Sequence, residues 1–223
     1  MDTLTLERPT LQPGKRFPMT YEEYHALDGE NLIAEWVNGE VIVHMSAKIE
    51  HQKLVGFLYT LIDLFVRLFN LGDVNIAPYE MCAVPGGSAR EPDLQFIARE
   101  NLSRLTRERL AGPADLIVEV VSDDSVYRDR VEKFHEYEEA GVREYWVIDP
   151  RPPGKQQAQF WVLGNDKRYV AGAVRDGVYR STVIQGFWLR VEWLMAEELP
   201  NPLAALAQVA GAEKVVKALH QRL

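Results

Sequence analysis

The spacing of apolar residues along the chain alternates between a helical pattern and a strand pattern. Across 47–70 the apolar side chains recur at steps of three and four, which predicts a long amphipathic helix lying on a sheet. The segment 115–121 (DLIVEVV) is almost continuously apolar or β-branched, which is typical of a central strand covered on both faces. Further strands are predicted at 74–84 and 92–98.

Two short motifs fix the beginning of the fold. Thr20 and Glu23 have the spacing of a capping box, so a short helix is expected to run to about residue 27. The dipeptide Asn38-Gly39 favours a type I′ turn, because both central residues of that turn need a positive φ. It predicts a hairpin of strands 33–38 and 40–44.

The other predicted elements are an arginine-rich helix at 102–110, a helix at 125–140 ended by Gly141, a strand at 144–148, strands at 159–163, 168–174 and 178–184, and C-terminal helices. The order predicts an α/β fold in which a mixed sheet is flanked by helices and carries an appended C-terminal β region. We expect an irregular arm at 1–18, a core at 19–155, and an extension at 156–223 packed on the same domain.

Composition limits the class of protein. The chain has 223 residues, of which 47% are hydrophobic, and it has one cysteine, Cys82. No stretch approaches the ~20 apolar residues of a membrane helix, and the N-terminus lacks a secretory pattern. A cytoplasmic protein with no membrane partner, no disulfide and no cysteine-based zinc site is expected.

The net charge of −8 runs against nucleic-acid binding, which depends on Lys and Arg. Arginines nevertheless gather in two short stretches, and Arg104, Arg107, Arg128 and Arg130 are the predicted phosphate contacts. The alternative is that they lie on solvated helix faces and are paired with Glu100, Glu108 and Asp129.

Asp93 and Glu119 stand at positions where acids are unusual. Asp93 opens a predicted strand, and Glu119 interrupts the apolar run 115–121. A buried carboxylate needs a cation or hydrogen bonds. If the two strands are neighbours, both acids could hold Mg²⁺, with the Val120 carbonyl as a further ligand. The alternative is that Asp93 caps a turn and Glu119 pairs with an arginine.

Four segments together resemble the Uma-type family of restriction endonucleases, within the PD-(D/E)-x-K nuclease superfamily. They span about residues 20–195. They are AEWVNGEVIV around Glu35, REPDLQF around Asp93, DLIVEVVSDDS around Glu119, and Lys133 and Tyr137 followed by GVREYWVIDP at 141–150.

The resemblance implies a restriction-endonuclease-like core with Mg²⁺, or Mn²⁺ in its place, at Asp93 and Glu119. The lysine expected two positions after the second acid is replaced by Val121. The family pattern implies that Lys133, on the following helix, takes its place and acts on the phosphate. The alternative is an ordinary surface lysine paired with Asp129 or Glu136.

The resemblance adds three candidates. Glu35 could bind metal or occupy an exposed strand position. His51 could lie near the site or be a hydrogen-bonded structural residue. Tyr137 could orient Lys133 or simply pack.

These residues predict a Mg²⁺-dependent endonuclease acting on DNA. One alternative is a non-catalytic module on the same fold that binds nucleic acid or protein, and another is a hydrolase of a small phosphorylated molecule. A homodimer, with 156–185 as a candidate interface, would suit cleavage of both strands of a duplex.

Overall fold

The computed structural model describes residues 14–27, 34–44, 48–151 and 157–222. The chain forms two compact units, residues 1–46 and residues 47–223. Among the described helices, none combines the length and the hydropathy that spanning a membrane requires.

The first unit is a small antiparallel sheet with one helix. Its strands lie in the order β1 (Arg16–Pro18), β3 (Glu40–Val43) and β2 (Ala34–Val37), and its helix is α1 (Tyr21–His25). The predicted hairpin is confirmed, with φ of 49° at Asn38 and 85° at Gly39. Residues Arg16–Pro18 are a strand, although the sequence placed them in an irregular arm; backbone pairing with β3 orders them despite the proline at the end.

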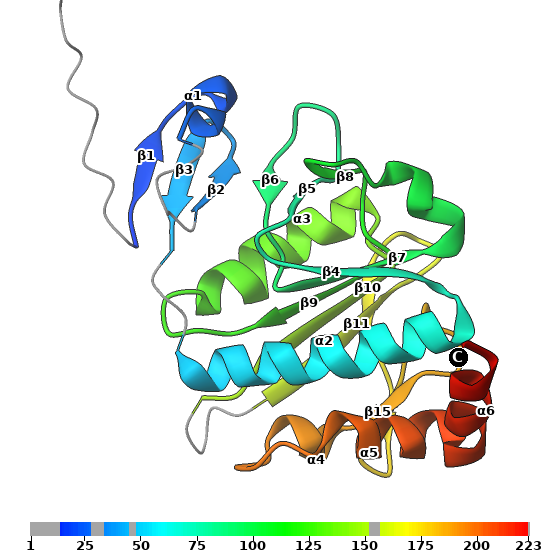
Figure 1. The fold of residues 1–223 in the computed structure, drawn as a ribbon. Coiled ribbons are helices and arrows are strands. Elements are labelled where there is room, and N and C mark those ends of the chain that lie inside the picture. The colour runs from blue at the N-terminus through cyan, green and yellow to red at the C-terminus, as the bar shows by residue number, and fades with distance from the viewer. Residues whose placement is uncertain (1–13, 28–33, 45–47, 152–156, 223) are drawn as a thin grey trace, which may run out of the picture. The chain divides into compact units, whose positions relative to one another are not determined.

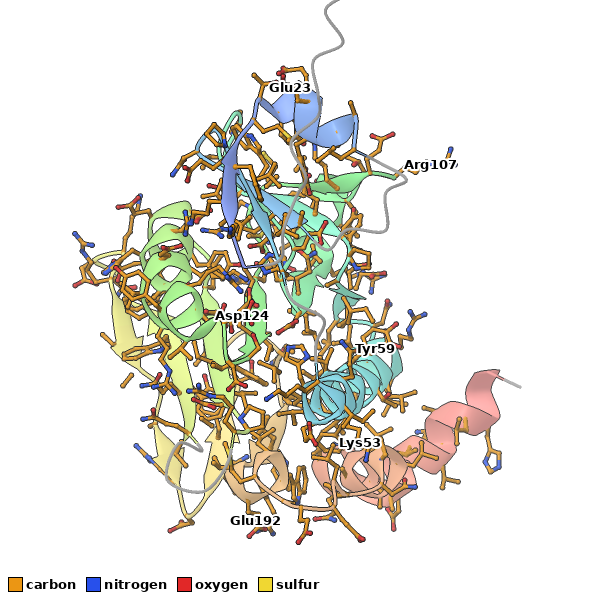
Figure 2. All side chains as sticks on the ribbon, turned by 90° about the vertical axis from the view of Figure 1, so that its left-hand side faces the viewer. Glu23, Lys53, Tyr59, Arg107, Asp124 and Glu192 are labelled. Atoms are coloured by element: carbon orange, nitrogen blue, oxygen red, sulfur yellow. The ribbon has the colours of Figure 1, made fainter. Side chains whose placement is uncertain are left out.

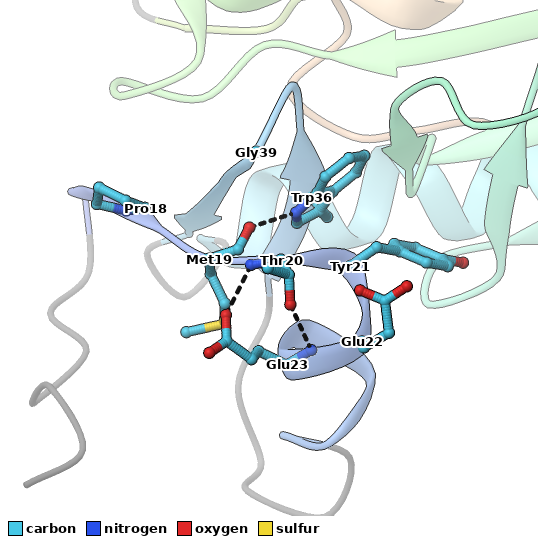
Figure 3. A pocket seen from close by; sticks show the side chains of 8 residues that line it. All are labelled: Pro18, Met19, Thr20, Tyr21, Glu22, Glu23, Trp36 and Gly39. Atoms are coloured by element: carbon cyan, nitrogen blue, oxygen red, sulfur yellow. Dashed lines mark hydrogen bonds between the residues drawn. The ribbon is translucent and has the colours of Figure 1, made fainter. Parts of the chain in front are cut away.

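The predicted capping box is also present in this unit. The backbone N–H of Glu23 donates to Thr20 Oγ1 at 3.2 Å, and the Thr20 N–H donates to the Glu23 carboxylate at 2.8 Å (Figure 3). The Trp36 indole N–H donates to the Met19 carbonyl at 2.8 Å beside the same helix (Figure 3). These bonds fix the start of α1 against the hairpin.

The second unit is built on a mixed sheet (Figure 1). Its strands lie in the order β12 (Tyr169–Ala171), β11 (Gln157–Leu163), β10 (Glu144–Asp149), β9 (Leu116–Val120), β7 (Leu94–Ala98) and β4 (Gly72–Ile76). Only β9 and β10 run parallel within it. Smaller groups are β6 (Ala89–Arg90), β5 (Glu80–Cys82) and β8 (Arg109–Ala111), and β13 (Val174–Arg175), β14 (Val178–Arg180) and β15 (Trp188–Arg190).

Helices cover both faces of the main sheet (Figure 1). The long helix α2 (Ile49–Phe69) packs its predicted apolar stripe on one face, with Trp146 and Phe96 in that core. Helix α3 (Lys133–Ala140) covers the other face, where Tyr137 and Tyr145 are buried. Further helices are η1 (Arg99–Arg104), η2 (Arg128–Glu132), α4 (Val191–Leu194), α5 (Pro202–Leu206), η3 (Ala207–Gly211) and α6 (Ala212–Arg222).

Several predicted elements differ in detail from the structure: the strand predicted at 168–174 is divided into β12 and β13, and the strand predicted at 178–184 ends at Arg180. The strand predicted at 74–84 is two strands, β4 and β5, separated by a segment that contains Pro78, which has no N–H to donate to a ladder. The predicted helix 102–110 is wrong: a 3₁₀ helix ends at Arg104, and strand β8 follows. The helix predicted at 125–140 contains the π-helical turn η2 before α3, and its end at Gly141, with φ of 82°, is confirmed.

A buried carboxylate, Glu144 on β10, anchors the C-terminal β region. Its side chain accepts hydrogen bonds at 2.6 to 3.2 Å from the indole of Trp146, the hydroxyls of Tyr179, Ser181 and Thr182, and the N–H groups of Thr182 and Val183. Glu144 is fully buried. Burial and the neighbouring carboxylate raise the pKa of the Tyr179 hydroxyl, which therefore stays protonated as a donor.

We predict that Glu144→Gln lowers the free energy of unfolding by about 3 kcal/mol, because an amide cannot accept all of these bonds on two oxygens. Urea denaturation followed by tryptophan fluorescence measures the change. Glu197→Gln, at an exposed position, is the control and should shift the free energy by less than about 0.5 kcal/mol. Equal denaturation midpoints for the two variants would contradict the anchoring role.

Candidate active site

Asp93 and Glu119 come together across neighbouring strands. Strands β7 and β9 pair antiparallel with Leu94 opposite Val118, so one step further along the ladder Asp93 faces Glu119. Residues directly opposite in such a pair project from the same face of the sheet. Asp93 Oδ2 also accepts the backbone N–H of Val120 at 2.8 Å, which fixes its carboxylate beside the end of β9.

Glu119 is held by two donors from α3. Lys133 Nζ lies 2.8 Å from Glu119 Oε1, and the Tyr137 hydroxyl donates to the same oxygen at 2.9 Å. All three side chains are buried, with Lys133 only 4% exposed. The alternative that Lys133 is an ordinary surface lysine is therefore wrong.

Asp129 is a further buried acid beside Lys133. It lies one helical turn earlier, in η2, with Oδ1 3.6 Å from Lys133 Nζ. Burial raises the pKa of the Asp129 carboxyl, although Lys133 and a hydrogen bond from Ser125 oppose that shift. The alternative for Lys133 named Asp129 as a partner on the protein surface; the pairing is present at i, i+4 spacing, but both side chains are buried.

His51 extends the site on the other side of Asp93. It lies in the first turn of α2, and its Nε2 is 3.2 Å from Asp93 Oδ2. Burial lowers the pKa of the imidazole, but the hydrogen bond to Asp93 and the charges of Asp93, Glu119 and Asp129 outweigh it, so that the pKa is raised above 6.5. Nδ1 is buried and has no hydrogen-bond partner in the described part of the chain.

The donor set suits a hard divalent cation. Within the described ranges, no three His, Cys, Asp or Glu side chains form a ready-made metal cluster. Mg²⁺, however, is typically held by one or two carboxylates while it keeps several waters. Both recorded bonds to Asp93 end on Oδ2, which leaves Oδ1 directed to no donor among the described residues. Asp93 and Glu119 therefore fit such an ion, and the role of the Val120 carbonyl stays a prediction.

Glu35 lies in the first unit, on β2. Its carboxylate is 3.3 Å from Nε2 of His44, a residue that sequence analysis did not single out. The predicted metal-binding role of Glu35 stays a prediction.

The four predicted phosphate contacts share no hydrogen-bond or ion-pair partner among the described residues. Arg104 donates to the Pro113 carbonyl at 2.7 Å, and Arg128 lies 3.9 Å from Asp124. Arg130 binds Asp149 and Gln157 at 2.8 and 2.9 Å. Arg107 is exposed and points outward, far along the surface from Asp124 (Figure 2). Local partners thus bind three of the four guanidinium groups, but none of these bonds goes to Glu100, Glu108 or Asp129, which the alternative named. The phosphate-binding role of the four arginines stays a prediction.

The fold is that of an α/β protein whose main sheet carries Asp93 opposite Glu119, with the buried Lys133 beside Glu119. A family model described as "Putative restriction endonuclease" (Uma2) matches residues 21–192, and the chain belongs to that family. This confirms the resemblance of the four sequence segments.

The fold is similar to that of a solved structure, a "putative nuclease belonging to DUF820" from Anabaena variabilis ATCC 29413. The TM-score is 0.63, with 15% identity over 80% of this chain and 98% of that one. This likeness confirms the predicted fold class. A comparison with curated proteins gave no significant match.

We predict that, in EDTA, the His51 imidazole titrates above pH 6.5 and that Asp93→Asn lowers its pKa, because the substitution removes the nearest negative charge. Since the pKa is raised by folding, His51 stabilises the protein below about pH 6.5, and this contribution is lost as pH rises through the folded pKa. Histidine NMR titration measures both values. Asp63→Asn, at an ion pair elsewhere on α2, should leave the His51 pKa unchanged; a His51 pKa that ignores Asp93→Asn would refute the coupling.

Proposed function

We propose that the protein is a Mg²⁺-dependent endonuclease that hydrolyses phosphodiester bonds in DNA. The observation that carries the proposal is the buried bond of 2.8 Å between Lys133 and Glu119, next to the position where Asp93 faces Glu119 in the ladder. Membership of the restriction endonuclease family supports nucleic acid as the substrate.

Asp93 and Glu119 would hold the cation, and when bound it would supply Lewis-acid stabilisation of the phosphate and activation of a water molecule. Lys133 brings a positive charge to the same spot, where it can stabilise negative charge that develops on the phosphate. The Tyr137 hydroxyl orients Glu119 by sharing its Oε1, and Asp129 holds the ammonium from the helix side.

The sequence has Val121 where the superfamily pattern has a lysine, and this difference supports a lysine that approaches the site from helix α3. Val121 is 1% exposed and belongs to the apolar core under α3. A lysine there would have to compete with that packing, whereas Lys133 reaches the Glu119 carboxylate from the adjacent helix. A carboxylate–ammonium pair is thereby formed although the lysine lies on helix α3 and not on strand β9.

A non-catalytic binding module remains the second candidate, because the net charge is −8 and most described arginines near the predicted site bind local acceptors. A homodimer also stays a prediction. Both candidates share the fold, so activity and metal binding have to separate them.

We predict Mg²⁺- or Mn²⁺-dependent nicking of supercoiled plasmid that is abolished by EDTA. Asp93→Asn, Glu119→Gln and Lys133→Met should each reduce the rate by about a hundredfold or more, the size of loss expected when one transition-state charge contact is removed. The nicking rate is measured by gel electrophoresis. The exposed Lys53, which lies on α2 (Figure 2), provides the matched control Lys53→Met and should keep full activity.

Thermal denaturation of each variant separates loss of catalysis from loss of folding. Metal-dependent nicking that persists at full rate in folded Asp93→Asn would rule out the assigned site. A folded wild-type protein that nicks the plasmid with neither Mg²⁺ nor Mn²⁺ would favour the binding module.

We further predict that Mg²⁺ lowers the pKa of His51, because a divalent cation on Asp93 would offset the negative charge that raises it. The readout is the same NMR titration with and without millimolar Mg²⁺, and it needs no substrate. In Asp93→Asn the ion should have no effect. A His51 pKa that does not respond to Mg²⁺ in the wild type would argue against a cation at Asp93.

A further inference from the structure

A cavity of about 390 Å³ lies against the hairpin of β13 and β14, at a distance from the candidate active site along the sheet. Val162, in its wall, pairs with Glu144 at the amino end of β10, whereas Glu119 pairs with Val147 near the carboxyl end of that strand. We call this the hairpin cavity; its lining includes Arg175, Val178, Tyr179, Arg180, Thr182 and Gly172.

Backbone geometry places two arginines on one face of the hairpin. Arg175 pairs with Val178 across a two-residue turn, and Arg180 follows Val178 by two positions on the same strand. Side chains two apart on a strand, or directly opposite on neighbouring strands, share a face. The turn residues Asp176 and Gly177 have φ of 51° and 72°, which matches a tight turn that fixes this register.

Neither Arg175 nor Arg180 forms an ion pair with a carboxylate among the residues that the structure describes, and no described acid lines the hairpin cavity. Asp176 belongs to the turn and does not line it. Ion pairs with carboxylates occupy arginines in other parts of the second unit: Arg67, Arg90, Arg130, Arg143, Arg151 and Arg168. The hairpin cavity thus brings two exposed guanidinium groups together in a lining that includes no described acid, in a chain with a net charge of −8.

The walls of the hairpin cavity are rigid. The Tyr179 ring stacks on Phe160 with centroids 3.8 Å apart, and the Thr182 hydroxyl donates to Glu144 at 2.7 Å. At Gly172, between β12 and β13, an added Cβ would lie 2.7 Å from the Tyr179 ring, so the backbone passes too close to the ring for a larger residue. A ligand would thus meet a preformed surface and lose little affinity to ordering of the backbone.

We propose that the hairpin cavity is a phosphate-binding site in which Arg175 and Arg180 hold the phosphate oxygens. Guanidinium groups match phosphate with paired, charge-assisted hydrogen bonds. The phosphate could belong to a free phosphate compound or to a nucleic-acid backbone. The site is separate from the candidate active site, so it does not depend on the proposed nuclease activity.

The test measures binding to the full chain in EDTA, where no cleavage occurs. Isothermal titration with pyrophosphate, thymidine 5′-monophosphate and a 12-nucleotide DNA gives three dissociation constants. The double variant Arg175→Gln/Arg180→Gln should weaken binding by about tenfold or more, because it removes the charge-assisted bonds. Lys214→Gln/Lys217→Gln removes the same charge from exposed positions of α6 and should change binding by less than about twofold.

Modification of arginines by phenylglyoxal, followed by peptide mapping, locates the site. Bound pyrophosphate or DNA should protect Arg175 and Arg180 but not Arg67, an exposed arginine on α2. Protection by pyrophosphate and nucleotide supports a free phosphate ligand, and protection by DNA alone supports a nucleic-acid backbone. Equal weakening in the two double variants, or protection of Arg67 to the same degree as Arg175 and Arg180, would overturn the proposal. So would an absence of binding by all three ligands.

Discussion

The buried ion pair of Lys133 and Glu119 is the interaction on which the arrangement of the candidate site depends. Removing both charges from water is costly, and a buried pair is tolerated only when further hydrogen bonds satisfy its members. Tyr137 supplies such a bond to Glu119, and Asp129 lies near Lys133 on the opposite side. The pair joins a central strand to the helix that covers it, so the position of α3 on the sheet and the position of the ammonium group are set together.

Several charged groups gather around this pair. Asp93, Glu119 and Asp129 lie close to the Lys133 ammonium group and the His51 imidazole, and the charge of Arg128 also acts on Asp129. The nearby carboxylates raise the pKa of His51 against the effect of its burial, and burial raises the pKa of Asp129. A cation bound between Asp93 and Glu119 would stabilise their charged forms, which is the physical basis for proposing a metal there.

The parts of the fold that sequence predicted correctly depend on neighbours in the chain. The capping box of Thr20, the Asn38-Gly39 turn and the apolar stripe of α2 are all decided by residues a few positions apart. The buried acid Glu119 was also visible, because a charge within an apolar strand is conspicuous. Its bond to Lys133 was not predicted, since it joins positions fourteen residues apart on a strand and a helix; the family resemblance supplied Lys133 only as a candidate near the site. Asp129 was expected as a surface partner of Lys133, because a charged residue on a helix usually lies in solvent.

The arginines show why a cluster in sequence is a poor guide to a binding surface in an acidic protein. A guanidinium group near any unsatisfied carboxylate or carbonyl binds it, as Arg130 does at Asp149. An arginine stays available only where the nearby acids are already satisfied. Beside the hairpin cavity the buried acid Glu144 already accepts bonds from hydroxyl, indole and backbone donors. This carboxylate anchors the hairpin, and its described bonds do not involve Arg175 or Arg180.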